Sequence, residues 1–317
     1  MGRDVGPDVV VIGSGLAGLT AARRLADAGR SVVVLDKGRR PGGRMATEEL
    51  AGGARADKGA QFFTVRSPEL AAAMVAWQDQ GLVHEWCRGF TSPDGHPRYA
   101  VAGGMAALPA ALAAGLDVRQ SVHVTSVAPE SGRWRVTWRA GHGVPAGSLA
   151  APAVVVTAPV PQSAVLLSGA AEVPDLAYDP TLSLVVALDG SGAVPAPGGV
   201  QLDGDATWSW VGDNVAKGAS AQPAVTLHTT AALAAERFDD DPDRLLADLL
   251  VAAAPWLGGA AVVEARCHRW RYATPTAPWP ERSCTVAPGC VLAGDAFGGP
   301  RVEGAFRSGL AAADALG

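Results

Sequence analysis

The chain has 317 residues, which is enough to bury two cores, so we expect two domains. Its net charge of −5 argues against nucleic acid or an anionic membrane surface as the main partner. The four cysteines show neither a CxxC pair nor metal-ligand spacing, which predicts reduced thiols and no metal site. The first expected strand begins by Val9 and leaves no room for a leader, so we predict a cytoplasmic protein without a membrane partner.

The first forty residues carry a dinucleotide-binding pattern. Val9–Ile12 is an apolar run that suits a buried parallel strand. Gly13-Ser14-Gly15-Leu16-Ala17-Gly18 follows directly and opens an expected helix over Leu16–Ala28. A second apolar strand, Ser31–Leu35, ends at Asp36. A GxGxxG run between a strand and a helix, with an acid after the next strand, is the context that the nucleotide fingerprint requires.

Each residue type in this pattern has a physical reason. Gly13 allows the tight turn, Gly15 lets the backbone approach a pyrophosphate, and Gly18 lets the helix pack close to the strand. The N–H groups and dipole at the helix N-terminus favour phosphates. Asp36 can accept hydrogen bonds from a ribose diol. The alternative is a glycine-rich turn without a ligand, and the fingerprint alone leaves NAD and FAD both open.

The next segments favour FAD. Gly42-Gly43-Arg44 follows the second strand, where an NAD-only domain has no need of it. The glycine pair permits close backbone approach, and Arg44 supplies a planar cation for phosphate or flavin oxygens. Further along, the turn Asp57–Phe63 can place the Gln61 amide and backbone groups beside an isoalloxazine ring.

Several elements are expected after these motifs. Ser67–Gln80 reads as a helix with Ser67 as N-cap and Pro68 at its first position. A second helix is expected over Ala106–Ala114. Alternation and β-branched runs predict strands over Asp117–Val127, Arg133–Arg139 and Val154–Thr157.

The chain changes character from Val160 to about Ser283, where proline and glycine are frequent and strands look short. Strands are expected over Thr181–Leu188, Ala206–Val211, Ala224–Thr229 and Val262–Tyr272. In the second of these, a period of two places Trp208 and Trp210 on one face. A helix over Pro242–Ala254, capped by Asp241, completes a sheet-based second domain.

The last segment returns to the nucleotide domain. Cys290–Asp295 is a short buried strand that ends in Gly294-Asp295, and a helix follows from about Val302 to Leu316. A carboxylate at a strand end suits a ribityl or ribose hydroxyl. The N-terminus of the following helix can stabilise negative charge on a reduced flavin.

Taken together, these separated motifs resemble the renalase-like family of FAD-dependent oxidoreductases on the amine-oxidase superfamily fold. The resemblance rests on GSGLAG with Asp36, on RPGGRMAT, on Asp57–Phe63, on HRWRYATP from His268 and on AGDAFGGPRVEGAFRSGLAAA from Ala293. It runs from Val9 to the last helix. The sequence departs from the family after Lys217 and at Thr229-Thr230-Ala231.

The resemblance implies an α/β Rossmann-like FAD-binding domain, with a parallel sheet and a small antiparallel crossover, plus an α+β substrate domain with a mixed antiparallel sheet. The FAD-binding domain is expected over 1–62, 103–160 and 285–317, and the substrate domain over 63–102 and 161–284. Noncovalent FAD is implied, because no Cys or His stands near Arg301–Glu303 to tether it. The expected cofactor contacts are Gly13, Gly15, Leu16, Ala17, Gly18, Asp36, Lys37, Arg40, Gly43, Arg44, Met45, Gly59, Ala60, Gln61, Val124, Gly294, Asp295, Arg301, Val302, Glu303 and Ala305.

Bacterial renalase-like enzymes are associated with the oxidation of isomeric dihydro-NAD(P), with release of hydrogen peroxide. The resemblance therefore implies a small-molecule substrate and O2 as partners of a monomer or weak homodimer. Such chemistry needs a flat slot that stacks a ring against the flavin. The candidate slot residues are Trp210, Asn214, His228, His268, Trp270 and Tyr272.

Other interpretations stay open. The three aromatic candidates can equally be core residues. An amine or amino-acid oxidase, or a desaturase, fits the same fold, and an inward-pointing Arg269 or Arg271 would favour an amino-acid carboxylate. A non-catalytic FAD-binding protein is the third possibility.

Overall fold

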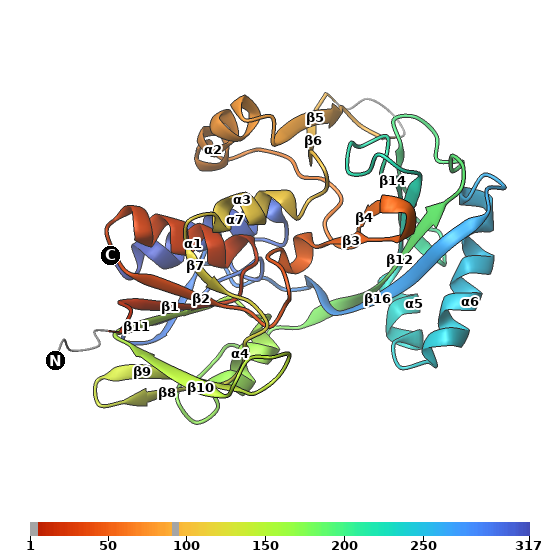
Figure 1. Cartoon of the computed structure of the whole chain (residues 1–317). Coiled ribbons are helices and arrows are strands. Elements are labelled where there is room, and N and C mark those ends of the chain that lie inside the picture. The colour runs from red at the N-terminus through yellow and green to blue at the C-terminus, as the bar shows by residue number, and fades with distance from the viewer. Residues whose placement is uncertain (1–5, 91–94) are drawn as a thin grey trace. The chain divides into compact units, whose positions relative to one another are not determined.

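The computed structural model describes residues 6–90 and 95–317, which form two compact units (Figure 1). Unit 1 comprises Met1–Gly43, Pro109–Ala177 and Pro275–Gly317. Unit 2 comprises Arg44–Leu108 and Tyr178–Thr274. Each unit is therefore built from segments that are distant in the sequence, and each has its own sheet.

Unit 1 is built on a six-stranded sheet in the order β17-β18-β11-β1-β2-β7. Neighbouring strands run parallel, except for the antiparallel edge pair β17 and β18. The strands are β1 (Val9–Ile12), β2 (Val32–Leu35), β7 (Asp117–Arg119), β11 (Ala153–Val156), β17 (Cys284–Ala287) and β18 (Cys290–Leu292). The predicted strands at Val9, Ser31, Val154 and Cys290 are confirmed within one to three residues at their ends.

Two helices cover this parallel sheet. Helices α1 (Leu16–Asp27) and α7 (Val302–Asp314) pack against each other (Figure 1). Gly309 permits their close approach, because a Cβ there would lie 2.3 Å from the Ala17 carbonyl oxygen. The core between helices and sheet contains Val9, Val11, Leu25, Val34, Val155, Val291 and Ala312.

The predicted single strand over Asp117–Val127 is wrong. The chain forms β7 at the edge of the parallel sheet and then β8 (His123–Glu130) in a separate three-stranded antiparallel sheet. Between them Ser121 has φ 61°, and its N–H donates to the Gly38 carbonyl oxygen. This left-handed residue turns the chain, and the partners of β8 are β9 (Arg133–Arg139) and then β10 (Gly147–Ala151).

Unit 2 contains a five-stranded sheet in the order β13-β14-β15-β12-β16. Its strands are β12 (Tyr178–Leu188), β13 (Gly199–Gln201), β14 (Trp208–Asp213), β15 (Ala224–Thr229) and β16 (Val262–Pro275). One face carries the larger core with α5 (Ala231–Arg237) and α6 (Pro242–Ala253), and it buries Leu184, Leu227, Leu245 and Leu249. Asp241 caps α6 by accepting from the Asp243 and Arg244 N–H groups, as predicted.

The prediction that Trp208 and Trp210 share a face is wrong. The pairing of β14 with β15 shifts between these residues, so that Trp208 lies opposite Thr229 and Trp210 opposite His228. This β-bulge sends the two rings to different faces. Trp208 joins the helix-covered core, and its indole N–H donates to the Ala252 carbonyl oxygen. Trp210 lies on the other face.

That other face is covered partly by the hairpin of β3 (Thr47–Glu49) and β4 (Arg55–Asp57), whose Leu50, Ala54 and Ala56 pack on it. Ser67 caps α2 (Pro68–Asp79), as predicted. The remaining elements are β5 (Val83–Cys87), β6 (Arg98–Val101), α3 (Ala107–Ala113), α4 (Val160–Leu166) and short 3-10 turns at Gly43–Met45, Ala51–Gly53 and Ala254–Trp256. In the part of the chain that the structure describes, no helix is long and apolar enough to cross a membrane.

Candidate functional site

The GxGxxG turn of unit 1 contains two glycines that the fold itself requires. Gly13 has φ +110°, and a Cβ there would lie 2.3 Å from Thr157 Oγ1 at the end of β11. A Cβ on Gly18 would lie 2.0 Å from the Gly13 carbonyl oxygen. Both positions therefore exclude any side chain, whether or not a ligand is bound.

Gly15 is different, because the space beside it is open. Among the described residues, a Cβ on Gly15 would meet only the Gly43 Cα, at 3.9 Å. Gly42 lies alongside in a parallel bridge, and its N–H donates to the Ser14 carbonyl oxygen. Helix α1 begins at the next residue, so unpaired helix N–H groups border this space. The site fits a diphosphate.

Asp36 follows β2 and is half-buried. Its Oδ2 accepts from the Ser14 N–H at 2.5 Å, and its Oδ1 accepts from the Gly38 N–H at 2.6 Å. Each carboxylate oxygen retains a lone pair for a ribose hydroxyl. Leu16 and Ala17 lie in the first turn of α1, while Lys37 and Arg40 lie exposed beyond Asp36. Together these residues fit the adenosine diphosphate half of a dinucleotide.

The C-terminal candidates cluster around the start of α7. Gly294 has φ +141°, and its N–H donates to Ser308 Oγ at 2.8 Å, which ties the end of β18 to this helix. Asp295 is half-buried beside it. Arg301, Val302, Glu303 and Ala305 form the N-cap and first turn of α7, and Val124 is buried on β8.

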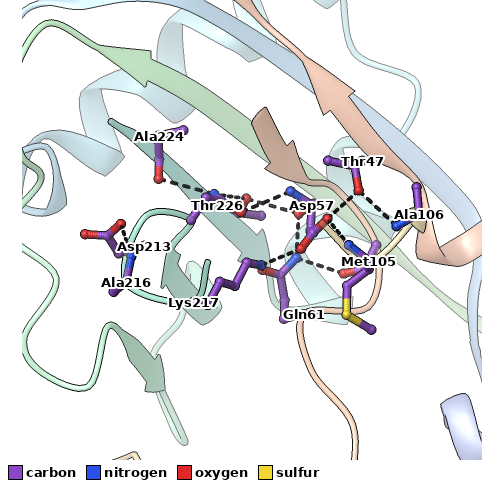
Figure 2. Close-up of polar contacts among 12 residues, drawn as sticks. Thr47, Asp57, Gln61, Met105, Ala106, Asp213, Ala216, Lys217, Ala224 and Thr226 are labelled. Carbon is purple, nitrogen blue, oxygen red and sulfur yellow. Dashed lines mark hydrogen bonds and ion pairs between the residues drawn. The ribbon is translucent and has the colours of Figure 1, made fainter. Parts of the chain in front are cut away.

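In unit 2 a buried ion pair organises the remaining candidates (Figure 2). The Lys217 side chain is 0% exposed, and its Nζ lies 3.0 Å from Asp57 Oδ2 and 2.7 Å from Gln61 Oε1. Asp57 Oδ1 accepts from Thr47 Oγ1 at 2.6 Å and from the Met105 N–H at 2.8 Å. No motif in the sequence indicated a role for Lys217.

Asn214, a predicted slot residue, belongs to the same network. Its Oδ1 accepts from the Asp57 N–H at 3.1 Å. Its Nδ2 donates to the Ala224 carbonyl oxygen and to Thr226 Oγ1. Thr226 in turn donates to the Asp57 carbonyl oxygen. The amide of Asn214 is thus committed to holding the end of β4.

The segment Lys58–Gln61 is clamped from several strands. Trp270 Nε1 on β16 donates to the Lys58 carbonyl oxygen at 2.7 Å, and the Lys58 backbone lies close enough to His228 on β15 to raise the pKa of that ring. Gln61 Nε2 donates to the carbonyl oxygens of Asp57 and Gly59 and lies 3.4 Å from His228 Nε2. The predicted flavin contacts Gly59, Ala60 and Gln61 therefore lie in one fixed segment.

Arg44 and Met45 precede this segment. A Cβ on Gly59 would lie 1.9 Å from the Arg44 carbonyl oxygen, which also accepts from the Ala60 N–H. The Arg44 guanidinium donates to the carbonyl oxygens of Tyr272 and Ala273 on β16. Met45 is buried.

Beside the clamped segment, three polar side chains form a row across the sheet. Ser183 on β12 and Trp210 on β14 both lie opposite His228 on β15. Directly opposite residues have Cβ atoms about 5 Å apart. Ser183 Oγ and Trp210 Nε1 are buried, and neither has a hydrogen-bond partner among the described residues. Buried polar atoms without partners are rare and often mark a ligand or water site.

Successive side chains of strand β16 point to opposite faces of the sheet. His268, Trp270 and Tyr272 share one side, where the rings of His268 and Trp270 are 4.1 Å apart and Tyr272 meets Tyr178 at 5.6 Å. Arg269 and Arg271 lie on the other side, toward α5. The Arg269 guanidinium donates to the carbonyl oxygens of Phe238 and Asp240, and Arg271 lies over the Phe238 ring.

Both histidines of this face are neutral at pH 7. Burial and the charge of Lys217 lower the pKa of His228 to about 4. Burial and the charge of Lys58 lower the pKa of His268 to about 4. Lys58 is itself paired with Glu48, their charged atoms 2.5 Å apart. The rings can therefore donate or accept hydrogen bonds without carrying charge.

An aromatic cluster that no sequence motif indicated lies next to Gln61. Phe62, Trp86, Phe90 and Trp210 pack with ring centroids 4.9 to 6.4 Å apart. The members come from three separate segments, so no sequence period could indicate them. They make an apolar wall next to the polar row.

No metal chemistry is indicated in residues 6–90 and 95–317, where no group of three or more His, Cys, Asp or Glu side chains could hold an ion. None of the four cysteines forms a disulfide bond with another described residue. Burial raises the pKa of Cys267 to about 11 and that of Cys290 to about 12, so both are thiols at pH 7.

A dinucleotide-binding α/β unit and an antiparallel-sheet unit are both found in FAD-dependent oxidoreductases, the class that the family comparison shows for this chain. The family model for flavin containing amine oxidoreductase matches residues 71–317, and the model for an NAD(P)-binding Rossmann-like domain matches residues 11–77. The chain belongs to the flavin-containing amine oxidoreductase family, and its cofactor is FAD.

Solved structures with the same fold include a putative protoporphyrinogen oxidase from Exiguobacterium sp. 255-15. It has a TM-score of 0.71 and 14% identity, over 97% of this chain and 98% of that one. A putrescine oxidase bound to putrescine gives a TM-score of 0.67 and 17% identity, over 98% of both chains. At these identities the likeness shows the fold alone.

Curated relatives match over short stretches. Lysine-specific histone demethylase 1 homolog 1 of Arabidopsis thaliana is 50% identical over 62 residues, which is 18% of this chain and 7% of the relative. Polyamine oxidase 1 of Oryza sativa subsp. japonica is 42% identical over 94 residues, 26% of this chain and 18% of the relative. The chain thus matches less than a fifth of the length of each of these relatives.

Proposed function

We propose that the protein is a renalase-like oxidase with noncovalent FAD, which oxidises a small cyclic substrate, such as the uncharged dihydropyridine ring of an isomeric dihydro-NAD(P). FAD supplies a two-electron acceptor that takes a hydride at flavin N5 and is reoxidised by O2. The balance is one dihydropyridine, one O2 and one proton, giving one pyridinium and one H2O2. The proton comes from solvent, so no side chain has to act as an acid on the substrate.

The observation that carries this proposal is the uncharged face of unit 2. Trp210, Trp270 and Tyr272 supply rings, while His228 and His268 are neutral at pH 7. The buried Ser183 hydroxyl and Trp210 N–H offer hydrogen bonds to an uncharged polar group of the substrate. Such a lining positions a ring by stacking and hydrogen bonding, which is what hydride transfer requires.

This face offers less support for a substrate with a charged amine or carboxylate beside its reacting atoms. An ammonium group needs a carboxylate, but Asp57 is already paired with Lys217, and Glu48 with Lys58. A substrate carboxylate needs an arginine, but Arg269 and Arg271 lie on the opposite side of β16. The two arginines that would favour an amino-acid oxidase therefore do not point to the candidate face.

An amine oxidase or desaturase is the second candidate. It is supported by the match to polyamine oxidase 1 and by a 47% identity over 58 residues to the hydroxyneurosporene desaturase of Rubrivivax gelatinosus. A non-catalytic FAD-binding protein is the third. The activities in these names belong to the relatives. Whether this protein shares any of them is decided by testing substrates.

The decisive experiment is an anaerobic screen of flavin bleaching in the purified holoprotein. Isomeric dihydro-NAD(P), diamines, polyamines and amino acids are the probes, and H2O2 is measured after air is admitted. We expect rapid bleaching by the dihydropyridines alone. Bleaching by amines alone would establish the second candidate, and bleaching by none of the probes would favour the third.

A matched pair of variants sharpens this screen. His268→Leu removes a polar group from the candidate face and should slow bleaching, whereas Arg271→Met, on the other side of the same strand, should leave the rate unchanged. A large loss of amino-acid oxidation in Arg271→Met would contradict the proposal. Release of FAD into the supernatant after acid precipitation of the protein would show noncovalent binding.

A further inference from the structure

We infer that Lys217 is a positioning residue of the candidate site: its ammonium group sets the orientation of the Gln61 amide, and through it the tautomer of His228 and the conformation of Lys58–Gln61. The inference rests on the proposed flavin contact of that segment for its functional meaning. Its geometry stands on unit 2 alone.

The first observation is the choice and burial of this cation. The chain has 26 lysines and arginines, of which only three are lysines, and two of these, Lys58 and Lys217, lie in this site. Lys217 is fully buried, and its partner Asp57 is 1% exposed. A buried ion pair often stabilises a fold no more than apolar residues of similar volume do. The compact ammonium group at this position therefore points to a role in orienting the hydrogen bonds of its neighbours.

The second observation is the direction of the hydrogen bonds. An ammonium group can only donate, so the atom of Gln61 that lies 2.7 Å from Lys217 Nζ must be the amide oxygen. The amide nitrogen then faces the carbonyl oxygens of Asp57 and Gly59, at 2.6 and 2.9 Å. With the amide flipped, three oxygens would meet there and Lys217 would face an N–H group.

The third observation extends this direction to His228. Its Nε2 lies 3.4 Å from the amide nitrogen of Gln61, which cannot accept a hydrogen bond, so a lone pair on Nε2 fits this contact and an Nε2–H group does not. The ring proton is then on Nδ1, and the Lys58 backbone lies close enough to the ring to raise the pKa of His228. The Lys58 carbonyl oxygen accepts from Trp270 Nε1. One ammonium group thus sets donors and acceptors from Gln61 through His228 to Lys58.

The charged groups around His228 are consistent with this order. Lys217 is the cation that acts on His228, and its ammonium group is paired with Asp57. Its neighbours across the sheet, Ser183 and Trp210, are uncharged. Burial lowers the pKa of Lys217, and the carboxylates of Asp57 and Asp213 act against burial by favouring its charged form.

The first test uses the wild-type protein. Nitrogen-15 NMR of labelled histidine distinguishes the two neutral tautomers, and His228 is identified as the signal missing in His228→Gln. We expect the Nδ1–H form at pH 7, both with and without FAD. The Nε2–H form, or a mixture of the two, would overturn the inference without any lysine variant.

The second test replaces the ion pair by a neutral pair of similar shape, Lys217→Met with Asp57→Asn, because Lys217→Met alone would leave an unpaired buried carboxylate. We expect a folded protein in which His228 becomes a mixture of tautomers, its pKa rises by about one unit, and the absorption band of bound FAD shifts. Thr47→Val is the control. It removes a hydrogen bond from the same carboxylate but keeps the ammonium group, so the His228 signals should remain those of wild type.

If the double variant and Thr47→Val give the same His228 signals, Lys217 is a structural cation only and the inference is wrong. These readings need no substrate. If dihydropyridines do not bleach the flavin, the proposed function fails, but the tautomer result is unaffected. The two failures can therefore be told apart.

Discussion

Gly13 and Gly15 lie two residues apart in the same turn, and they serve different physical purposes. Gly13→Ala would place a methyl group 2.3 Å from Thr157 Oγ1 at a positive φ, so it should destabilise the protein by roughly 2–4 kcal/mol. Gly15→Ala fills open space, so it should leave the FAD-free protein stable and lower FAD affinity at least about tenfold, by blocking the diphosphate.

Urea unfolding of the FAD-free variants and FAD titration followed by flavin fluorescence measure these two effects separately. Each variant is the control for the other, because Gly13→Ala should lower the stability of the FAD-free protein and Gly15→Ala should lower the affinity for FAD. Full FAD affinity in Gly15→Ala would refute the assignment of the diphosphate site to this turn.

The neutral histidines predict a pH dependence of stability. Both His228 and His268 have a pKa of about 4 in the folded protein, against 6.5 for an ordinary histidine. As pH falls from 6.5 to 4, the unfolded chain takes up the protons first, so the free energy of unfolding must fall. Each residue should contribute roughly 2–3 kcal/mol to this loss.

Urea denaturation at several pH values in this window measures the loss. In a protein carrying both His228→Gln and His268→Gln, the decline between pH 6.5 and 4.5 should be clearly shallower than in wild type. An unchanged slope would mean that these rings are not the groups that take up protons.

At the scale of the element, the cap of α6 gives a local prediction. Asp241 accepts from two N–H groups of the first turn, so Asp241→Ala should lower the free energy of unfolding by about 1 kcal/mol. Asp239→Ala is the matched control, because Asp239 is 84% exposed at that position and makes only a surface ion pair with Arg271.

Chemical denaturation of both variants tests this, and FAD binding should be unchanged in each. Equal losses in the two variants would mean that nearby negative charge, rather than the cap, stabilises the helix. Helix α6 packs on the core face of the unit 2 sheet, away from the face that carries the candidate site.

The elements also show where local patterns succeed and fail. Caps and glycine turns are read from neighbouring residues, so α1, α2 and α6 begin at the predicted residues. Strand faces depend on the partner strand. In β14, alternation put Trp208 and Trp210 together, but the bulge against β15 separated them. A one-residue register shift reverses every side chain beyond it.

For the whole molecule, cofactor binding should appear as stability. A ligand that binds only the folded state raises the free energy of unfolding by about 2.7 kcal/mol when it is present at 100 times its dissociation constant. Thermal unfolding of the FAD-free protein should therefore shift upward on titration with FAD. Under the same conditions Gly15→Ala should show little shift, and an equal shift would contradict the diphosphate assignment.

The fold class and the Rossmann-like strand–helix–strand unit could be predicted because their residues are close in sequence. Gly13, Gly15, Gly18 and Asp36 lie within one strand–helix–strand unit. The candidate site of unit 2 could be predicted only in part. His228, Trp270 and Gln61 do meet, but Asn214 is committed to the backbone of Asp57, and Ser183 and the Phe62–Trp86–Phe90 wall were not foreseen.

The sequence by itself determined the nucleotide turn, the helix caps and the amine-oxidase superfamily, because each rests on motifs whose residues lie close together in the chain. Only the tertiary structure decided what faces the candidate site. Lys217 and Gln61 are 156 positions apart, and their hydrogen bond forms because two chain segments meet beneath one sheet. Burial then turned an ordinary lysine in a turn into a directional ammonium group, since water no longer supplies its hydrogen bonds.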